Sequence, residues 1–225
     1  MSLRKHNNST LHSSNFTLKT RGILQMDQNE IKELFKKNNA LLSGHFLLSS
    51  GLHSDTYFQS ALILQHSKEA EKLALELAKQ INEKNIKIDA VVSPAMGGII
   101  IGHEIARALG VRAIFTERVD GKVILRRGFS VNKDEKIAVV EDVITTGLST
   151  KEVIDSITPM GANVVAVASL VDRSAGKVDF GIPRFSLLSL EVKSYKAEEC
   201  PLCKDGSAAV KPGSRTAGQQ VIGNR

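Results

Sequence analysis

Two consecutive carboxylates, Glu141 and Asp142, follow an apolar run and precede a short loop of hydroxyl residues that contains one glycine. Over residues 137–150 the chain reads Ile-Ala-Val-Val-Glu-Asp-Val-Ile-Thr-Thr-Gly-Leu-Ser-Thr. The apolar run predicts a buried strand, and ligands of open α/β sheets bind at the carboxyl ends of such strands. Carboxylates beside a bound phosphate would repel it. We therefore expect them to face sugar hydroxyls, directly or through a magnesium ion.

The loop after the carboxylates has the composition of a phosphate cradle. Its amides, the N-terminus of the following helix and the hydroxyls of Thr145, Thr146, Ser149 and Thr150 can together hold a dianionic phosphate. Gly147 lets the backbone approach the ligand closely. The loop is not a P-loop, because no G-x-x-x-x-G-K-[ST] string is present. An ordinary strand–loop–helix junction is the structural alternative, but the length and order of the string favour a ribose-phosphate site over residues 139–150.

Apolar periodicity predicts the elements that position this site. Three- and four-residue spacing predicts helices over residues 26–42, 67–81, 99–109 and 150–160. Short apolar runs predict strands over residues 90–93, 111–115, 137–140, 164–171 and 185–190. Apolar strands that alternate with helices are typical of a parallel sheet buried on both faces, so we expect an α/β fold. Residues 26–205 are the expected domain, between a disordered leader or extension at 1–25 and a polar, disordered tail at 206–225.

Composition excludes several classes of function. The net charge is +6, but residues 1–26 contain Arg4, Lys5, Lys19 and Arg21 and no acid, which leaves about +2 for the rest of the 225 residues. With 4% aromatics and no tryptophan, a stacking platform for nucleic acid is not expected. No apolar run approaches the ~20 residues of a membrane span. Two cysteines and the lack of a secretory leader indicate a cytoplasmic protein.

The string at 139–150 resembles the signature for phosphoribosyl pyrophosphate (PRPP) of the type I phosphoribosyltransferases. Further segments at 41–59, 93–99, 115–129 and 170–173 occur in the order found in orotate phosphoribosyltransferases. The resemblance extends over about residues 27–205 and is to a divergent, bacterial-type subgroup of that family. It implies the type I phosphoribosyltransferase fold, in which helices flank a central, mostly parallel sheet that carries a small hood region.

The resemblance also implies which residues bind PRPP. Glu141 and Asp142 would contact the ribose hydroxyls, and the loop around the 5′-phosphate would consist of Val143, Ile144, Thr145, Thr146, Gly147, Leu148 and Ser149. The stretch Ser-Pro-Ala-Met-Gly-Gly at 93–98 would hold the pyrophosphate, with Ala95, Gly97 and Gly98 as its key positions. By itself that stretch is equally well a glycine-rich strand-to-helix turn.

For the base, the resemblance implies four contacts. Tyr57 and Phe58 match an aromatic pair that could flank a planar pyrimidine, although two adjacent aromatics are more often core residues. Arg173 matches an arginine that grips the orotate carboxylate in a bidentate fashion, although a lone strand-end arginine is usually solvated. Thr145 would also contact orotate. Hypoxanthine-type enzymes have an aspartate at that position, so Thr145 disfavours a purine substrate.

The polar stretch 116–130 resembles the mobile catalytic loop of the family, which reaches into the neighbouring subunit and so implies a homodimer. It contains the cations Arg118, Lys122, Arg126 and Arg127. Pyrophosphate leaves with growing negative charge, which magnesium and such cations can stabilise. We expect Arg118, Lys122 and Asp142 to be catalytic, and Mg²⁺ to be a cofactor held mainly through PRPP. The structural alternative is a charged hairpin on the surface.

Three features depart from this expectation or add to it. Many family members have a lysine where this chain has Ser49 and another where it has Gly97, and Arg126 or Arg127 could compensate. The pair Cys200-Pro-Leu-Cys203 has the spacing of half a zinc knuckle. No second pair follows, and no histidine lies beyond His103, so we expect no metal there unless another chain supplies ligands.

The expected activity is the transfer of the phosphoribosyl group from PRPP to orotate, giving orotidine 5′-monophosphate in pyrimidine synthesis. Two alternatives stay open. One is a phosphoribosyltransferase for another base, and the other is a PRPP-sensing regulator without catalysis, which would need a nucleic-acid surface.

Overall fold

The computed structural model describes residues 26–48 and 50–212. The expected leader at 1–25, residue 49, and residues 213–225 of the expected tail lie outside the described residues.

The central sheet has six strands in the order β5-β4-β3-β6-β7-β8. Their bounds are β3 Ala90–Pro94, β4 Arg112–Val119, β5 Lys122–Leu125, β6 Lys136–Ile144, β7 Asn163–Asp172 and β8 Arg184–Ser189. Neighbouring strands are parallel, except that β5 pairs antiparallel with β4 as a hairpin at the edge. The prediction of a mostly parallel α/β sheet is confirmed.

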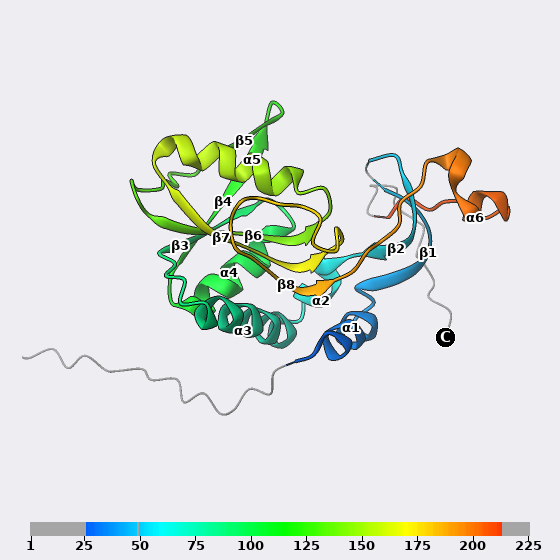
Figure 1. Ribbon diagram of the computed structural model, residues 1–225, viewed down its shortest axis with the longest axis horizontal. Coiled ribbons are helices and arrows are strands. Elements are labelled where there is room, and N and C mark those ends of the chain that lie inside the picture. The colour runs from blue at the N-terminus through cyan, green and yellow to red at the C-terminus, as the bar shows by residue number, and fades with distance from the viewer. Residues whose placement is uncertain (1–25, 49, 213–225) are drawn as a thin grey trace, which may run out of the picture.

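Helices cover both faces of this sheet (Figure 1). The helices are α1 Gln28–Lys37, α2 Ser60–Leu64, α3 Ser67–Glu83, α4 Gly98–Leu109, α5 Leu148–Ile157 and α6 Pro201–Lys204, with 3₁₀ turns at Thr158–Met160 and Ala197–Glu199. Alternate strand residues face opposite layers: Val140 packs in the cluster with α1, α3 and α4, whereas Val139 packs against α5. This period of two follows from the pleat of the strand.

One difference from the sequence prediction has a local cause. The first helix, predicted over 26–42, ends at Lys37, because Asn39 adopts a positive φ of 53° and the chain turns into β1 (Leu41–Leu47). Apolar Leu41 and Leu42 continue the helical pattern in the sequence, yet they belong to the strand.

A small hood lies beside the central sheet and consists of residues 41–58 and 191–212 (Figure 1). Its hairpin pairs β1 antiparallel with β2 (His53–Phe58). The C-terminal segment pairs with this hairpin at two places: the amide of His53 donates to the carbonyl of Tyr195 at 2.8 Å and the reverse bond measures 2.9 Å, and the amide of Val210 donates to the carbonyl of His45 at 2.8 Å. Ordered contacts thus continue past residue 205, where the sequence placed the end of the domain.

The hood also corrects one expectation about the cysteines. His45 and His53 lie beside Cys200 and Cys203, with ligand atoms within 4.8 Å of one another. Four potential metal ligands therefore come from one chain. The sequence reasoning missed the histidines because it looked only at residues that follow the cysteines.

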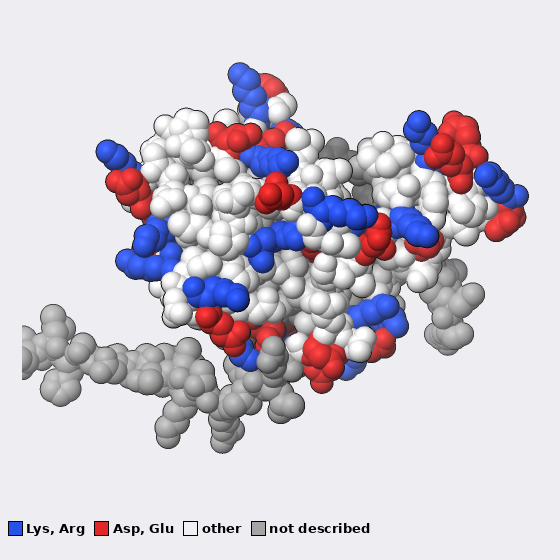
Figure 2. All heavy atoms as spheres, viewed as in Figure 1, with Lys and Arg blue, Asp and Glu red and all other residues white. Residues whose placement is uncertain are grey.

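Figure 2 shows Lys and Arg side chains interspersed with Asp and Glu over the visible face of the described residues. Among the described residues, no helix is long and apolar enough to cross a membrane.

Candidate active site

A cavity of about 620 Å³ lies where β6 and β7 end and the hood begins. Residues from four separate parts of the chain line it: Leu48, Ser50, Leu52, Tyr57, Phe58, Gln59, Asp142, Val143, Thr145, Thr146, Leu148, Ser149, Arg173, Val192 and Ser194. The predicted phosphate loop and the predicted base contacts thus share one cavity. Its position at the carboxyl edge of a parallel sheet is where ligands of α/β folds bind.

The phosphate loop leads directly into α5. Gly147 adopts a left-handed φ of 74° at the N-cap, and an added Cβ there would lie 2.5 Å from Val178 Cγ1. The structure requires glycine at this position, because the backbone is left-handed and Val178 leaves no room for a side chain. The exposed hydroxyls of Thr145 and Thr146 and the N-terminal amides of α5 are then available to a phosphate.

The two consecutive carboxylates point to opposite faces of the sheet. Glu141 accepts a hydrogen bond from the hydroxyl of Thr150 in α5 and is not part of the cavity lining. Asp142 lines the cavity and lies against Gly97 on the other face. Of the two, Asp142 is therefore the one that faces a ligand directly.

Burial determines the protonation of this pair. It raises the pKa of Glu141 to about 7, although the hydrogen bond from Thr150 acts in the other direction. Burial also raises the pKa of Asp142. A carboxylate that lines a cavity with a raised pKa, as Asp142 does, is typical of functional sites, because a ligand or cation can offset the cost of its charge.

The predicted pyrophosphate loop touches Asp142 without lining the cavity. An added Cβ on Gly97 would lie 2.7 Å from Asp142 Oδ1, and one on Gly98 would lie 3.0 Å from the carbonyl oxygen of Val140. The turn at residues 95–98 thus packs closely on the end of β6. This packing gives a physical reason for the departure at Gly97: a lysine there would displace the Asp142 carboxylate.

Arg173 is a partly buried cation at the cavity wall. Its Nε is buried without a hydrogen-bond partner, and no carboxylate among the described residues lies within ion-pair distance of it. Burial lowers the pKa of the guanidinium, which marks a charge that lacks a compensating partner. A planar anion entering the cavity would supply one.

Asp172 fixes the turn that presents Arg173. Its carboxylate accepts hydrogen bonds from the amides of Ser174 at 2.8 Å and Gly176 at 3.0 Å, and it forms an ion pair with Arg184 at 3.1 Å. The side chain of Asp172 is 2% exposed, so this network is protected from water. These contacts fix the backbone of the turn after β7. The turn therefore holds Arg173 at the cavity wall before a ligand binds.

The aromatic pair divides between the cavity and the core. Tyr57 is half-buried and packs on Phe46 with ring centroids 5.7 Å apart, and burial raises the pKa of its phenol. Phe58 borders the cavity but is 6% exposed and packs edge-on against Phe35 in the main core. Adjacent strand residues point to opposite faces, so one of the pair faces the ligand and the other anchors the strand.

Three further residues that the sequence predicted for the site lie outside the lining of the cavity. Ile144 is fully buried, and its carbonyl accepts from the amide of Arg173 at 2.8 Å, so its side chain is a core residue. Arg118 and Lys122 lie on the β4–β5 hairpin, outside the lining of the cavity. Arg118 pairs with Glu152 of α5, which raises the pKa of the guanidinium. Within the described residues, the Lys122 side chain has no ion-pair partner.

Arg126 and Arg127, which could compensate for the lysines missing at positions 49 and 97, form ion pairs within their own chain. Arg127 Nε donates to Glu117 at 2.7 Å, and Arg126 lies 3.6 Å from the same carboxylate. Both side chains are more than half exposed, so these pairs hold them weakly.

Sequence reasoning missed six lining residues: Leu48, Ser50, Leu52, Gln59, Val192 and Ser194. The first four fall within segment 41–59, which resembles the orotate phosphoribosyltransferases. That resemblance could have identified them as residues of the site. Val192 and Ser194 follow the last strand of the sheet and carry no local pattern that marks a site.

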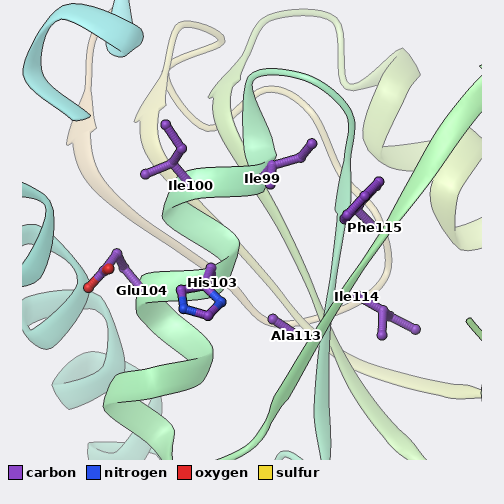
Figure 3. Close-up of a pocket in the computed structure, with 7 residues that line it drawn as sticks. All are labelled: Ile99, Ile100, His103, Glu104, Ala113, Ile114 and Phe115. Carbon is purple, nitrogen blue, oxygen red and sulfur yellow. The ribbon is translucent and has the colours of Figure 1, made fainter. Parts of the chain in front are cut away.

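A second cavity of about 420 Å³ lies between α4 and β4 (Figure 3). Its walls are mainly apolar and include Ile99, Ile100 and Phe115. The one carboxylate in its lining, Glu104, already pairs with Arg107 at 2.7 Å. His103 is the other titratable side chain in the lining, and a single imidazole among apolar walls does not make a set of convergent polar groups.

Comparisons with known proteins agree with this geometry. The family described as "Phosphoribosyl transferase domain" matches residues 60–200. The orotate phosphoribosyltransferase of Heliobacterium modesticaldum is 53% identical over 191 residues, covering 85% of this chain and 100% of its own. That of Carboxydothermus hydrogenoformans is 54% identical over 186 residues, covering 83% and 97%.

A solved structure extends the comparison to the fold. The crystal structure of orotate phosphoribosyltransferase from Aeropyrum pernix superposes with a TM-score of 0.57 at 26% identity, covering 72% of this chain and 94% of that one. The mostly parallel sheet flanked by helices is thus the type I phosphoribosyltransferase fold. The chain belongs to the orotate phosphoribosyltransferase family.

Proposed function

We propose that the chain transfers the phosphoribosyl group of PRPP to N1 of orotate, giving orotidine 5′-monophosphate and pyrophosphate in pyrimidine synthesis. The bond from the ribose C1 to the pyrophosphate oxygen breaks, the bond from C1 to N1 forms, and the N1 proton is lost. The observation that carries the proposal is that Arg173, with an unpartnered Nε, shares a cavity with the phosphate loop. Orotate is a planar base with a carboxylate, which a guanidinium can bind in a bidentate fashion.

Each wall of the cavity then has a role. The hydroxyls and amides of residues 145–149 hold the 5′-phosphate, and Asp142 accepts from the ribose hydroxyls. Tyr57 lies against the base, and Arg173 binds its carboxylate. Both substrates are thereby fixed next to each other, which lowers the entropic cost of their reaction. Glu141 lies outside the cavity lining, and the hydrogen bond that it accepts from Thr150 would hold the start of α5, and with it the phosphate loop, in place.

Magnesium fits this site as a cation held mainly by the substrate. Mg²⁺ prefers oxygen ligands and is often bound through one or two carboxylates together with substrate phosphates. Among the described residues that line the cavity, Asp142 is the carboxylate available to it. When bound, the ion would neutralise charge on the departing pyrophosphate.

We also propose a homodimer in which residues 116–130 of one subunit complete the site of the other. Arg118 and Lys122 do not line the cavity of their own chain, which supports an action across subunits. The apolar groove in Figure 3 lies on β4, the same strand that continues into the hairpin. A second copy seated there would cover half-exposed Ile100 and meet the hairpin. We place the enzyme in the cytoplasm, where its two free cysteines would stay reduced.

A spectrophotometric orotate assay tests the activity. Orotate absorbance should change only when both PRPP and magnesium are present, and uracil, hypoxanthine and adenine should not turn over. Turnover of another base without turnover of orotate would refute the choice of substrate. A gel shift of RNA or DNA that responds to PRPP, with no orotidine monophosphate formed, would instead support a regulator.

A further inference from the structure

Four side chains with metal-binding atoms converge in the hood, on the side of β1 and β2 next to the C-terminal segment. His45 and His53 come from the two strands of the hairpin, and Cys200 and Cys203 come from the start of α6. We propose that these four residues bind one zinc ion as a structural site. The proposal does not depend on the substrate assigned above.

The distances between the four ligand atoms fit a tetrahedral ion. Zinc bonds of about 2.3 Å to sulfur and about 2.0–2.1 Å to nitrogen place neighbouring ligand atoms roughly 3.3–3.8 Å apart. His45 Nε2 lies 3.5 Å from Cys200 Sγ and 3.7 Å from Cys203 Sγ. His53 Nδ1 lies 3.3 Å from Cys203 Sγ. The two imidazole nitrogens are closer, at 2.7 Å, and would separate by roughly half an ångström around an ion.

A hydrogen bond outside the cluster orients one of the ligands. The other ring nitrogen of His45, Nδ1, lies 2.9 Å from the carbonyl oxygen of Ser207. A carbonyl only accepts, so Nδ1 carries the proton and the lone pair of Nε2 faces the cluster. Metal-bound histidines usually donate their second ring N–H to a carbonyl or carboxylate in this way.

The burial of its ligands distinguishes this cluster from a chance grouping of side chains on the surface. His45 is 6% exposed and Cys200 is 1% exposed, so two polar ligands are held away from water. Neither residue belongs to the two apolar clusters that fill the layers of the main domain, and neither does the buried Phe46 beside them. Among the described residues, the hood therefore forms no third apolar cluster of its own, and small units of this kind commonly rely on a metal or on disulfides.

Four protein ligands leave no open position for a substrate, which is typical of structural zinc and not of catalytic zinc. The ion would fasten the β1–β2 hairpin to residues 195–210, across the same contact that the His53–Tyr195 backbone bonds make. The hairpin also carries the cavity residues Leu48, Leu52 and Tyr57. The zinc would thus help to hold the base side of the cavity in place, since its ligand His53 directly follows the lining residue Leu52.

Metal analysis of the purified full-length protein is the primary test. After expression in zinc-supplemented medium and gel filtration, elemental analysis should find about one zinc per chain. Cys200→Ser and His53→Ala should each lose most of it. His66→Ala is the matched control, since His66 is an exposed histidine outside the cluster, and it should keep the full amount.

Cobalt provides a spectroscopic test that does not depend on a variant's folding. Cobalt(II) exchanged into the wild-type protein should give intense visible bands of a tetrahedral site together with thiolate-to-cobalt charge transfer. Cys200 and Cys203 are the only cysteines of the chain, so the charge-transfer band can come from no other thiol. His53→Cys, which keeps four ligands, should retain zinc and shift the cobalt spectrum.

The effect of zinc on stability and on substrate binding can be measured independently of the amount of bound zinc. Removing zinc with a chelator should lower the melting temperature and raise the KM for orotate more than the KM for PRPP. Wild-type protein that holds no zinc and no cobalt, with two titratable thiols in the native state, would overturn the proposal. So would an intramolecular Cys200–Cys203 disulfide found by mass spectrometry in freshly purified protein.

Discussion

Gly97 lies so close to Asp142 that a methyl group on its Cα would stand 2.7 Å from the carboxylate oxygen Oδ1. The contact joins the turn after β3 to the end of β6, two parallel neighbours in the sheet. It explains how a loop that does not line the cavity can still determine where the ribose-facing carboxylate points.

The first prediction concerns this contact. Gly97→Ala should lower kcat/KM for PRPP by about 10- to 100-fold, because small displacements of a positioned group have effects of that size. The fold should tolerate the change, since Gly97 has helical angles of φ −59° and ψ −40°, which alanine adopts readily. Steady-state kinetics and thermal unfolding measure the two effects separately.

A double-mutant cycle shows whether the effect passes through Asp142. Asp142→Asn alone should weaken PRPP use while leaving the fold intact. If Gly97→Ala acts by moving this carboxylate, the double variant should be little worse than the worse single variant. Fully additive losses would mean that Gly97 acts on the pyrophosphate by another route.

The second prediction concerns Arg173. Arg173→Gln should lower kcat/KM for orotate by roughly 30-fold or more, as expected when one partner of a buried charge pair is removed. The effect on PRPP should be smaller, because the phosphate loop is unchanged. Discrimination between orotate and uracil should also narrow, since uracil lacks the carboxylate.

Lys72→Gln is the control for that variant, because Lys72 forms an exposed ion pair with Glu69 in α3 and lines neither cavity. It should leave orotate kinetics unchanged. Equal losses for orotate and PRPP in Arg173→Gln would point to a general disturbance of the site.

The third prediction concerns Glu141, whose pKa burial raises to about 7 from an ordinary value of 4.5. A carboxyl with a raised pKa in the folded state binds its proton more tightly when folded than when unfolded. Its contribution to stability is therefore fully present below about 4.5 and is lost as the pH rises through about 7.

Urea unfolding of the wild type and Glu141→Gln across this pH range measures that contribution. The free energy of unfolding of the wild type, minus that of the variant, should fall between these two pH values and stay flat above them. A difference that does not vary with pH would show that Glu141 has the same pKa in the folded and unfolded states.

The fourth prediction concerns the hairpin and the second subunit. Lys122→Ala should lower kcat more than it changes the KM for PRPP, because Lys122 would act on the leaving pyrophosphate. A rise in KM alone would contradict that role.

Mixing the Lys122→Ala and Asp142→Asn proteins tests whether the loop crosses between subunits. If it does, each mixed dimer regains one intact site, and refolding the two proteins together should restore about a quarter of wild-type activity. If the loop serves its own chain, every site carries one substitution and activity stays at the level of the parents. Each variant refolded alone is the control, and it should show no gain in activity.

The sequence by itself determined the parts of this protein that depend on neighbours in the chain. Alternation of apolar strands with helices predicted the parallel sheet, and Gly110 and Gly161, both left-handed in the structure, marked the ends predicted for two helices. The phosphate loop could be predicted as well, because strand, carboxylates, hydroxyls and glycine occupy one continuous stretch.

Tertiary structure alone decided which residues meet across the chain. It turned Asp142 toward the cavity and Glu141 toward Thr150. It also packed the hood beside the central sheet, so that Tyr57 and Arg173 line the same cavity although their strands belong to different sheets. It also placed His45 beside Cys200, which lies 155 residues further along the chain. The physical reason is that contacts over such separations depend on the packing of the whole sheet and hood, whereas periodicity and motif spacing report only on residues a few positions apart.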